Sequence, residues 1–182
     1  MAQELGQIVD VELIALGLAE TAAADGDLDE AERYAAAAAE RLEELKSVQI
    51  ANAIAVLSRV RTAKGDHGSD LELRDERPLS TEWDVFTKAD WLRARALALL
   101  GLGRLDEAAA LAEQNLALVL PTELMVQQAD ALETAARIHL ARGMPSDAIR
   151  DLEAALDLNV KKERTPAIQR TRELLAIASG SR

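Results

Sequence analysis

A six-residue phrase occurs twice in this chain, as GDLDEA at residues 26–31 and as GRLDEA at residues 103–108. A more divergent copy, GMPSDA, occupies residues 143–148, and a further glycine, Gly65, lies between the first two copies. The four glycines are 39, 38 and 40 residues apart. A near-constant period of this length is typical of stacked repeats, in which each unit buries its apolar face against the next. We therefore expect a helical repeat fold.

The apolar residues are mostly alanine and leucine. Hydrophobic residues make up 49% of the 182 positions, yet the chain has only two Trp, one Tyr and one Phe. Alanine is the best helix former, and its small side chain lets helix axes approach closely. We predict an all-α fold, an α-α superhelix of about four helical hairpins and a C-terminal helix, in a single domain over residues 1–182.

Apolar periodicity and helix breakers divide the chain into repeats at about 3–46, 47–80, 81–121 and 122–160, with a terminal helix at 165–179. Ser47 and Thr122 are expected to begin helices. In the first helix one apolar stripe is formed by Ile8, Val11, Ile14, Leu18 and Ala22. Residues 65–80 contain Pro78 and many charges, which predict a loop with at most a short helical turn.

The residues around these turns resemble tetratricopeptide repeats. In that family small residues occupy one position of the first helix and two of the second, with a glycine in the turn. The matching residues are Ala19, Gly26, Ala31 and Ala38 in the first repeat, Ala96, Gly103 and Ala108 in the third, and Ala136, Gly143, Ala148 and Ala155 in the fourth. In the third repeat Asn115 replaces the last small residue. A larger side chain at these positions would push the helix axes apart. The resemblance covers most of residues 7–159.

The second repeat departs from this pattern. Ser58 and Gly65 match its first half, but Asp70 and Arg77 occupy the positions of the second helix. Charged side chains cannot lie unpaired in a tight apolar contact, so a regular second helix is not expected there. Residues 129–175 also resemble the C-terminal helical repeats of bacterial signalling proteins, among them large ATPase-type transcriptional activators and cyclases. The Ala- and Arg-rich composition suggests a bacterial source with a GC-rich genome.

The resemblance implies a binding surface. In tetratricopeptide arrays the first helix of each pair lines a concave groove that binds a protein or peptide. The corresponding residues here are Glu20, Asn52, Arg59, Asp90, Arg93, Asp130, Glu133 and Arg137. Mixed charges in a groove can fix the register of a bound segment, although Glu133 and Arg137 are also spaced as a surface helical pair. Leu16 and Glu20 replace the Lys and Asn of chaperone-binding members, so chaperone tails are not expected partners.

Three of the four aromatic residues, Trp83, Phe86 and Trp91, fall within nine positions. They could form a ligand-facing pocket, since Trp is favoured at binding hot spots. The alternative, which we favour, is that the rings fill the space left by the missing helix of the second repeat.

No catalytic or metal site is expected. Asp25, Asp27 and Asp29 alternate like the start of a calcium loop, but the glycine and the final glutamate of such a loop are absent. We expect these carboxylates at a helix N-terminus. The two histidines, His67 and His139, have no ligand partner at a suitable spacing; His67 is expected in a loop and His139 as a partly buried packing residue.

Composition restricts the partners further. The net charge of −11 disfavours nucleic acid and anionic lipid, and the absence of cysteine excludes disulfides and thiolate chemistry. With no signal peptide or membrane-spanning run expected, we predict a cytoplasmic protein without a cofactor. The main hypothesis is a non-catalytic scaffold or adaptor that binds a protein or peptide. One alternative is a structural module that self-associates into a homo-oligomer. The other is a small-molecule sensor or helical enzyme with a pocket at the second repeat.

Overall fold

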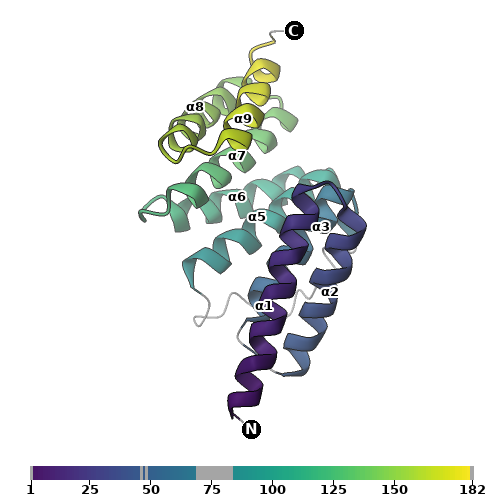
Figure 1. The fold of residues 1–182 in the computed structure, drawn as a ribbon. Coiled ribbons are helices and arrows are strands. Elements are labelled where there is room, and N and C mark those ends of the chain that lie inside the picture. Colours follow the sequence, from purple (N-terminus) through teal and green to yellow (C-terminus); the bar gives the residue numbers. More distant parts are fainter. Residues whose placement is uncertain (1, 46, 48, 69–83, 181–182) are drawn as a thin grey trace. The chain divides into compact units, whose positions relative to one another are not determined.

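The computed structural model describes residues 2–45, 47, 49–68 and 84–180, which divide into two compact units at residues 1–87 and 88–182. The first unit contains α1 (Ala2–Ala24), α2 (Leu28–Glu44) and α3 (Ile50–Lys64). Helix α2 packs against both α1 and α3, and α1 also contacts α3 (Figure 1).

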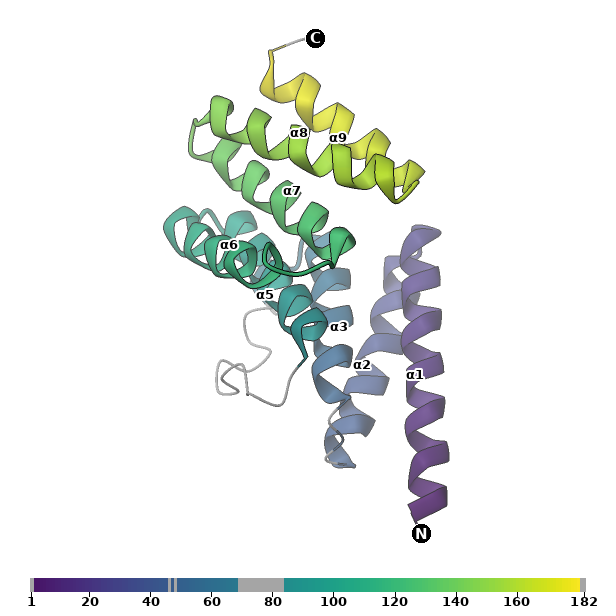
Figure 2. The same ribbon diagram turned by 90° about the vertical axis from the view of Figure 1, so that its left-hand side faces the viewer.

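The second unit repeats this arrangement. It contains most of α5 (Val85–Gly101), then α6 (Leu105–Val119), α7 (Met125–Ala141), α8 (Pro145–Lys161) and α9 (Thr165–Ala178). Consecutive helices pack together from α6 to α9, and α7 also contacts α9, as α1 contacts α3 (Figure 2). Within the described residues every regular element is a helix, and neighbouring helices pack in a repeat-like order. The expectation of an all-α fold of stacked hairpins is confirmed.

The glycines of the recurring phrases end their helices in the left-handed conformation. At Gly143, which has φ 73°, the N–H donates to the carbonyl of Leu140, and the next N–H, of Met144, donates to the carbonyl of His139 at 2.8 Å. This pair of bonds satisfies two carbonyls that the helix end would otherwise leave free, and glycine adopts the required φ at least cost. The same two bonds recur at Gly26, Gly65, Gly103 and, with φ 54°, at Glu163.

The small residues of the repeat pattern are buried. The eight alanines of this pattern are all 0% exposed: Ala19, Ala31, Ala38, Ala96, Ala108, Ala136, Ala148 and Ala155. Ser58 and Asn115, at the equivalent positions of other repeats, are buried as well. The small side chains of the repeat pattern therefore occupy buried positions, as close packing of helices requires.

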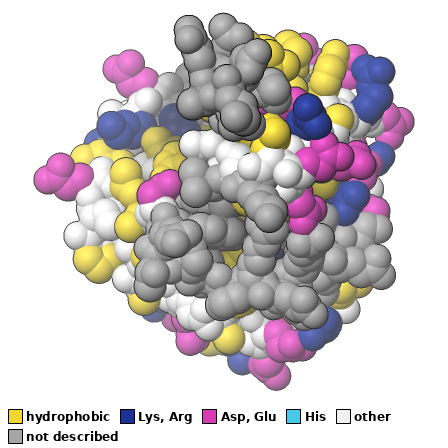
Figure 3. Space-filling view, turned by 90° about the horizontal axis from the view of Figure 1, so that it is seen from below, with side chains coloured by type: hydrophobic (Ala, Val, Ile, Leu, Met, Phe, Trp, Pro, Cys, Tyr) yellow, Lys and Arg dark blue, Asp and Glu magenta, His cyan; other side chains and the backbone are white. Residues whose placement is uncertain are grey.

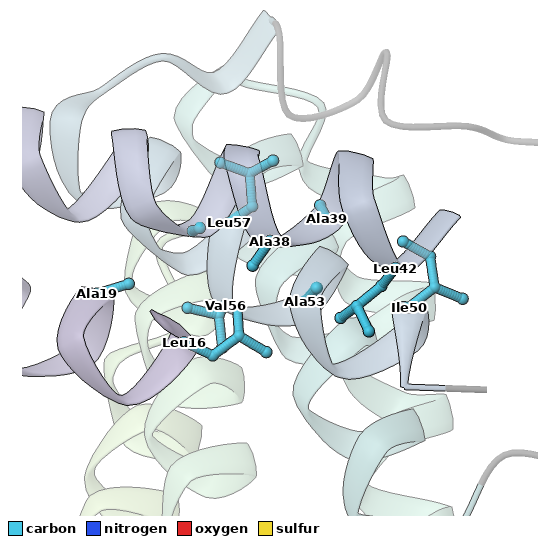
Figure 4. Close-up of a cluster of buried hydrophobic side chains, with 10 residues drawn as sticks. Leu16, Ala19, Ala38, Ala39, Leu42, Ile50, Ala53, Val56 and Leu57 are labelled. Atoms are coloured by element: carbon cyan, nitrogen blue, oxygen red, sulfur yellow. The ribbon is translucent and has the colours of Figure 1, made fainter. Parts of the chain in front are cut away.

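The core of the first unit explains which side of α1 packs. Leu16 and Ala19 lie against Ala38 and Leu42 of α2 and Val56 of α3 (Figure 4). The other apolar stripe of α1, with Val11, Ile14 and Leu18, is exposed. Helix α1 is therefore apolar on two sides, and the stripe singled out from the sequence is the one that does not pack in this unit.

An ion-pair network joins α2 to α3. Lys64 Nζ lies 2.7 Å from Asp29 Oδ1 and 2.6 Å from Glu32 Oε2, and Arg61 Nε donates to Glu32 Oε1 at 2.9 Å. Hydrogen bonds from Lys64 and then Arg61 hold the pKa of Glu32 below its usual value, against the opposing effect of burial. Lys64 lowers the pKa of Asp29 in the same way.

Two helices begin later than expected. Ser47 does not cap α3; its hydroxyl accepts from the N–H of Gln49, and the helix begins at Ile50. Thr122 closes the turn before α7, because its hydroxyl donates to the carbonyl of Val119 at 2.7 Å and accepts from the N–H of Leu124. Short polar side chains next to a helix start can bond to the turn as readily as to the helix.

Most of residues 65–80, with Asp70, Arg77 and the loop expected there, lies outside the described residues. Hydrophobic, acidic and basic side chains are interspersed on the described surface shown in Figure 3. None of the described helices combines the length and apolar character needed to cross a bilayer.

Candidate functional site

The first unit brings together two of the residues assigned to the groove. Glu20 is on α1 and Arg59 is on α3, 39 positions later, and Arg59 Nη2 donates to Glu20 Oε1. Both side chains are partly exposed to solvent. Their separation of one repeat length reflects equivalent places on the first helices of two successive hairpins.

A cavity of about 320 Å³ lies next to this pair. Apart from Glu20 and Arg59 its walls are apolar and come from the ends of α1 and α3 and the start of α2: Ala23, Ala24, Leu28, Val56, Val60 and Ala63. Small-molecule pockets usually have volumes of roughly 300–1,000 Å³, with apolar walls and a few polar groups. This cavity is therefore at the small end of the range, and it can hold one apolar side chain or a small ligand.

In the second unit the groove residues of α7 face charged residues of α9. Arg170 Nε donates to both carboxylate oxygens of Glu133, at 2.8 and 3.0 Å, and Arg137 Nη2 lies 3.4 Å from Glu133 Oε1. Glu133 is only 9% exposed, whereas Arg137 and Arg170 are 37% and 42% exposed. One buried carboxylate thus lies between two guanidinium groups that reach the solvent.

A second ion pair lies at the start of α9. Arg164 Nη1 donates to Asp130 Oδ1 at 2.9 Å and to the side-chain oxygen of Asn159 at 3.0 Å. The amide of Asn159 donates in turn to the hydroxyl of Thr171, which is completely buried. Burial opposes the charge of Arg170, but Glu133 and the more distant Asp130 raise the pKa of Arg170 above its usual value.

The remaining groove residues are less closely connected. Asp90 and Arg93, one turn apart on α5, are separated by 3.8 Å between Arg93 Nε and Asp90 Oδ1. Asn52 is half-buried on α3. Of the eight residues assigned from the resemblance, five lie in local clusters. Glu20 and Arg59 form one cluster in the first unit, and Asp130, Glu133 and Arg137 lie near one another in the second.

The aromatic residues do not form a described cluster. Trp83 lies outside the described residues, and Phe86 is 49% exposed on α5. The guanidinium of Arg95 lies 5.0 Å from the ring centroid of Trp91, one turn away on the same helix. This is the geometry of a cation–π contact.

The carboxylates near Gly26 have structural partners. Asp27 precedes α2, and its side chain accepts from the N–H of Glu30 at 3.0 Å; Asp29 pairs with Lys64. The expectation that these groups belong to a helix N-terminus is confirmed for Asp27 and Asp29, whereas Asp25 directly follows the last residue of α1. Among the described residues no cluster of three or more His, Asp and Glu side chains is placed to hold a metal ion.

The histidines have different surroundings. His139 Nε2 is 3.6 Å from Asp151 Oδ2, so this half-buried ring lies between α7 and α8, as expected for a packing residue. His67 is also half-buried and is helical rather than part of a loop.

Sequence reasoning missed the partners that α9 and the residue before it supply to Asp130, Glu133 and Asn159. They are Arg164, Arg170 and Thr171. A signal for them exists, because Arg170 follows Glu133 by 37 residues and Arg164 follows Asp130 by 34. These separations approach one repeat length, so α9 can be recognised as the first helix of a further hairpin.

Taken together, the fold and these surfaces define an all-helical chain whose hairpins pack in a repeat-like order. The chain matches no protein-family model, and a search of curated proteins also finds no match.

Proposed function

We propose that this chain is a non-catalytic, tetratricopeptide-like scaffold that binds a protein or peptide segment along the first helices of its hairpins. The observation that carries the proposal is the cavity between α1 and α3, with Glu20 and Arg59 at its edge. These two residues, which the resemblance to tetratricopeptide repeats assigned to the groove, line this cavity.

The chemistry of the cavity favours an apolar side chain as its occupant. Six of its eight lining residues are Ala, Val or Leu, and the two charged ones already neutralise each other. Burial of an apolar group contributes roughly 25 cal/mol per Å² of apolar surface removed from water. The Glu20–Arg59 pair is partly exposed and therefore weak. Its two side chains can give up their mutual hydrogen bond and bind the amide groups of a peptide backbone instead.

The packed helices also reduce the ordering cost of binding. Val56 and Val60 are buried on α3, and Val56 belongs to the core cluster of the first unit. A preformed surface loses less conformational entropy than one that must fold around its ligand. No chemical step or cofactor is part of the proposed role, and the likeness of residues 129–175 to bacterial signalling proteins suggests a regulatory setting.

Selection from a random peptide library tests this proposal. Peptides selected on the 182-residue chain are expected to share an apolar residue, and their affinity can be measured by fluorescence anisotropy. Ala63→Leu adds bulk at the exposed edge of the cavity and should weaken binding tenfold or more. Ala37→Leu, at an exposed position of α2 outside the cavity, is the matched control and should have no effect.

Two results would overturn the proposal. One is a library that yields no peptide above background on the folded chain. The other is a set of peptides that bind Ala63→Leu and wild type equally well, which would place any binding surface elsewhere.

A further inference from the structure

The turn that joins two walls of the α1–α3 cavity is acidic. Ala24 at the end of α1 and Leu28 at the start of α2 both line the cavity, and residues 25–27 connect them. Asp25 and Asp27 are exposed in this turn, and within the described residues neither makes an ion pair. One carboxylate oxygen of Asp27 accepts from a backbone N–H in the first turn of α2. Two uncompensated carboxylates therefore lie beside an apolar cavity.

Glu20 adds a third carboxylate at the edge of the cavity. Arg59 Nη2 donates to Oε1 of Glu20, while Oε2 accepts no hydrogen bond from the part of the chain that the structure describes. The Glu20 side chain is the more exposed of the pair, at 55% against 29% for Arg59. Its second oxygen can therefore accept from a group that approaches from the solvent.

The other cations of the first unit already have carboxylate partners. Arg61 and Lys64, at the end of α3, pair with carboxylates of α2. Apart from Arg59, the remaining cations described in residues 10–68 are Arg33 and Arg41, and each pairs with a glutamate of its own helix. No cation described in this stretch is therefore left to neutralise the acidic turn.

The negative charge of the protein is also concentrated in this part of the chain. Residues 1–68 contain 13 Asp and Glu and six Lys and Arg, whereas residues 84–182 contain 14 and 13. Helix ends act in the same direction, because α1 and α3 both end beside the cavity and only α2 begins there. The C-terminal end of a helix carries partial negative charge. The cavity therefore attracts a cation both through its nearest carboxylates and through the charge of the surrounding segment.

We propose that the segment bound at this cavity is basic, with an apolar side chain inside the cavity and a Lys or Arg next to it in sequence. The inference rests on the proposed function and names the chemistry of its partner. The apolar side chain supplies the burial, and the neighbouring cation pairs with Glu20 Oε2 or with Asp25 and Asp27. Because these carboxylates are exposed, each pair adds little affinity; the charge chiefly selects the partner and speeds its association.

Fluorescence anisotropy with labelled peptides of equal length tests this inference. Each of three peptides has one central leucine, flanked by lysines, by serines or by glutamates. Affinity should fall in that order, with roughly a threefold to tenfold difference between the lysine and serine peptides. High salt should remove most of this difference, since it screens exposed charges. A fourth peptide, with lysines around a central alanine, should bind more weakly than the lysine peptide with leucine, because it lacks the apolar anchor.

Two double variants of equal net charge locate the carboxylates responsible. Asp25→Asn combined with Asp27→Asn removes the charge of the acidic turn, and asparagine still caps α2. This variant should lose most of the preference for lysine over serine. Asp10→Asn combined with Glu40→Gln is the control, because both residues are exposed and lie about 15 Å or more along their helices from the nearest lining residue. The control should keep the wild-type preference.

The results that contradict a basic partner differ from those that contradict the cavity itself. If Ala63→Leu weakens binding but the three leucine peptides bind equally, or the glutamate peptide binds best, the partner is not basic and the cavity remains the site. A lysine preference that survives Asp25→Asn with Asp27→Asn also contradicts the inference. If no peptide binds, or if Ala63→Leu leaves the affinity of the lysine peptide unchanged, the proposed function fails together with the inference.

Discussion

Arg170 of α9 donates from Nε to both carboxylate oxygens of Glu133 on α7, at 2.8 and 3.0 Å. Glu133 also lies next to Arg137 and accepts from the hydroxyl of Thr171 at 3.4 Å. This carboxylate is thus the shared partner of groups on two helices that belong to successive hairpins. Because Glu133 is buried, loss of its charge should affect stability more than loss of the exposed charges around it.

Removal of this charge should destabilise the second unit. Glu133→Gln keeps the shape of the side chain but leaves the two arginines without their counter-charge. We expect the free energy of unfolding to fall by about 1–2 kcal/mol, towards the low end for charged hydrogen bonds because both arginines reach solvent. Urea unfolding measures the change, and Glu153→Gln, at an exposed position of α8, is the control. Equal stability of the two variants would mean that Glu133 does not hold α9 in place.

The small residues at the helix contacts should not tolerate added bulk. Ala155 is fully buried on α8, and its neighbour Ala154 is exposed. Ala155→Leu should lower the free energy of unfolding by about 1–3 kcal/mol, because the helices would have to move apart. Ala154→Leu adds the same side chain to the same helix and should change stability by less than about 0.5 kcal/mol. Similar losses in the two variants would argue against close helix contact as the reason for alanine here.

The turns offer a paired test of backbone conformation. Gly143→Ala should cost about 1 kcal/mol, since a Cβ disfavours the left-handed region. Glu163→Gly, at the equivalent position after α8, should raise stability by up to about 1 kcal/mol, less the extra entropy that glycine gives the unfolded chain. Thermal and urea unfolding both report this difference. A stabilising Gly143→Ala would contradict the left-handed geometry at that turn.

These turns and contacts were predictable because their causes are local. A glycine that ends a helix makes the same pair of backbone bonds wherever it recurs. The alanine near the start of the next helix likewise allows the same close approach in each repeat. The ion pairs between α7 and α9 were predictable only on the α7 side. Asp130 and Glu133 could be placed on a first helix, but the pairing of Glu133 with Arg170 depends on how α7 and α9 pack.

Helix α1 shows a different limit. Both the stripe with Leu16 and the stripe with Ile14 have helical spacing, so periodicity alone cannot tell which of them packs. The neighbours supply that information. Small residues of α2, such as Ala38, meet Leu16 and leave Ile14 exposed.

Acid should weaken the contact between α2 and α3. The pKa of Glu32 is lowered in the folded state, so its contribution to stability is complete above its usual value of about 4.5 and is lost as the pH falls through the folded pKa. We expect the free energy of unfolding of wild type to decrease below that pH, and Glu32→Gln to decrease less steeply. Unfolding by urea at a series of pH values measures both slopes.

Glu40→Gln is the control for this titration, because Glu40 is exposed on the same helix and makes no ion pair in the described chain. It should keep the wild-type slope. A Glu32→Gln profile parallel to wild type would show that the bonds from Lys64 and Arg61 do not favour the charged carboxylate.

The central claim is that the first helices of the hairpins form the binding surface. Backbone amide chemical shifts of the 182-residue chain, recorded during titration with a library-selected peptide, test this most directly. We expect the largest changes at the lining residues of α1 and α3, from Glu20 to Ala24 and from Val56 to Ala63. Changes concentrated at the exposed positions of α2 or α8, with those two segments unaffected, would contradict it.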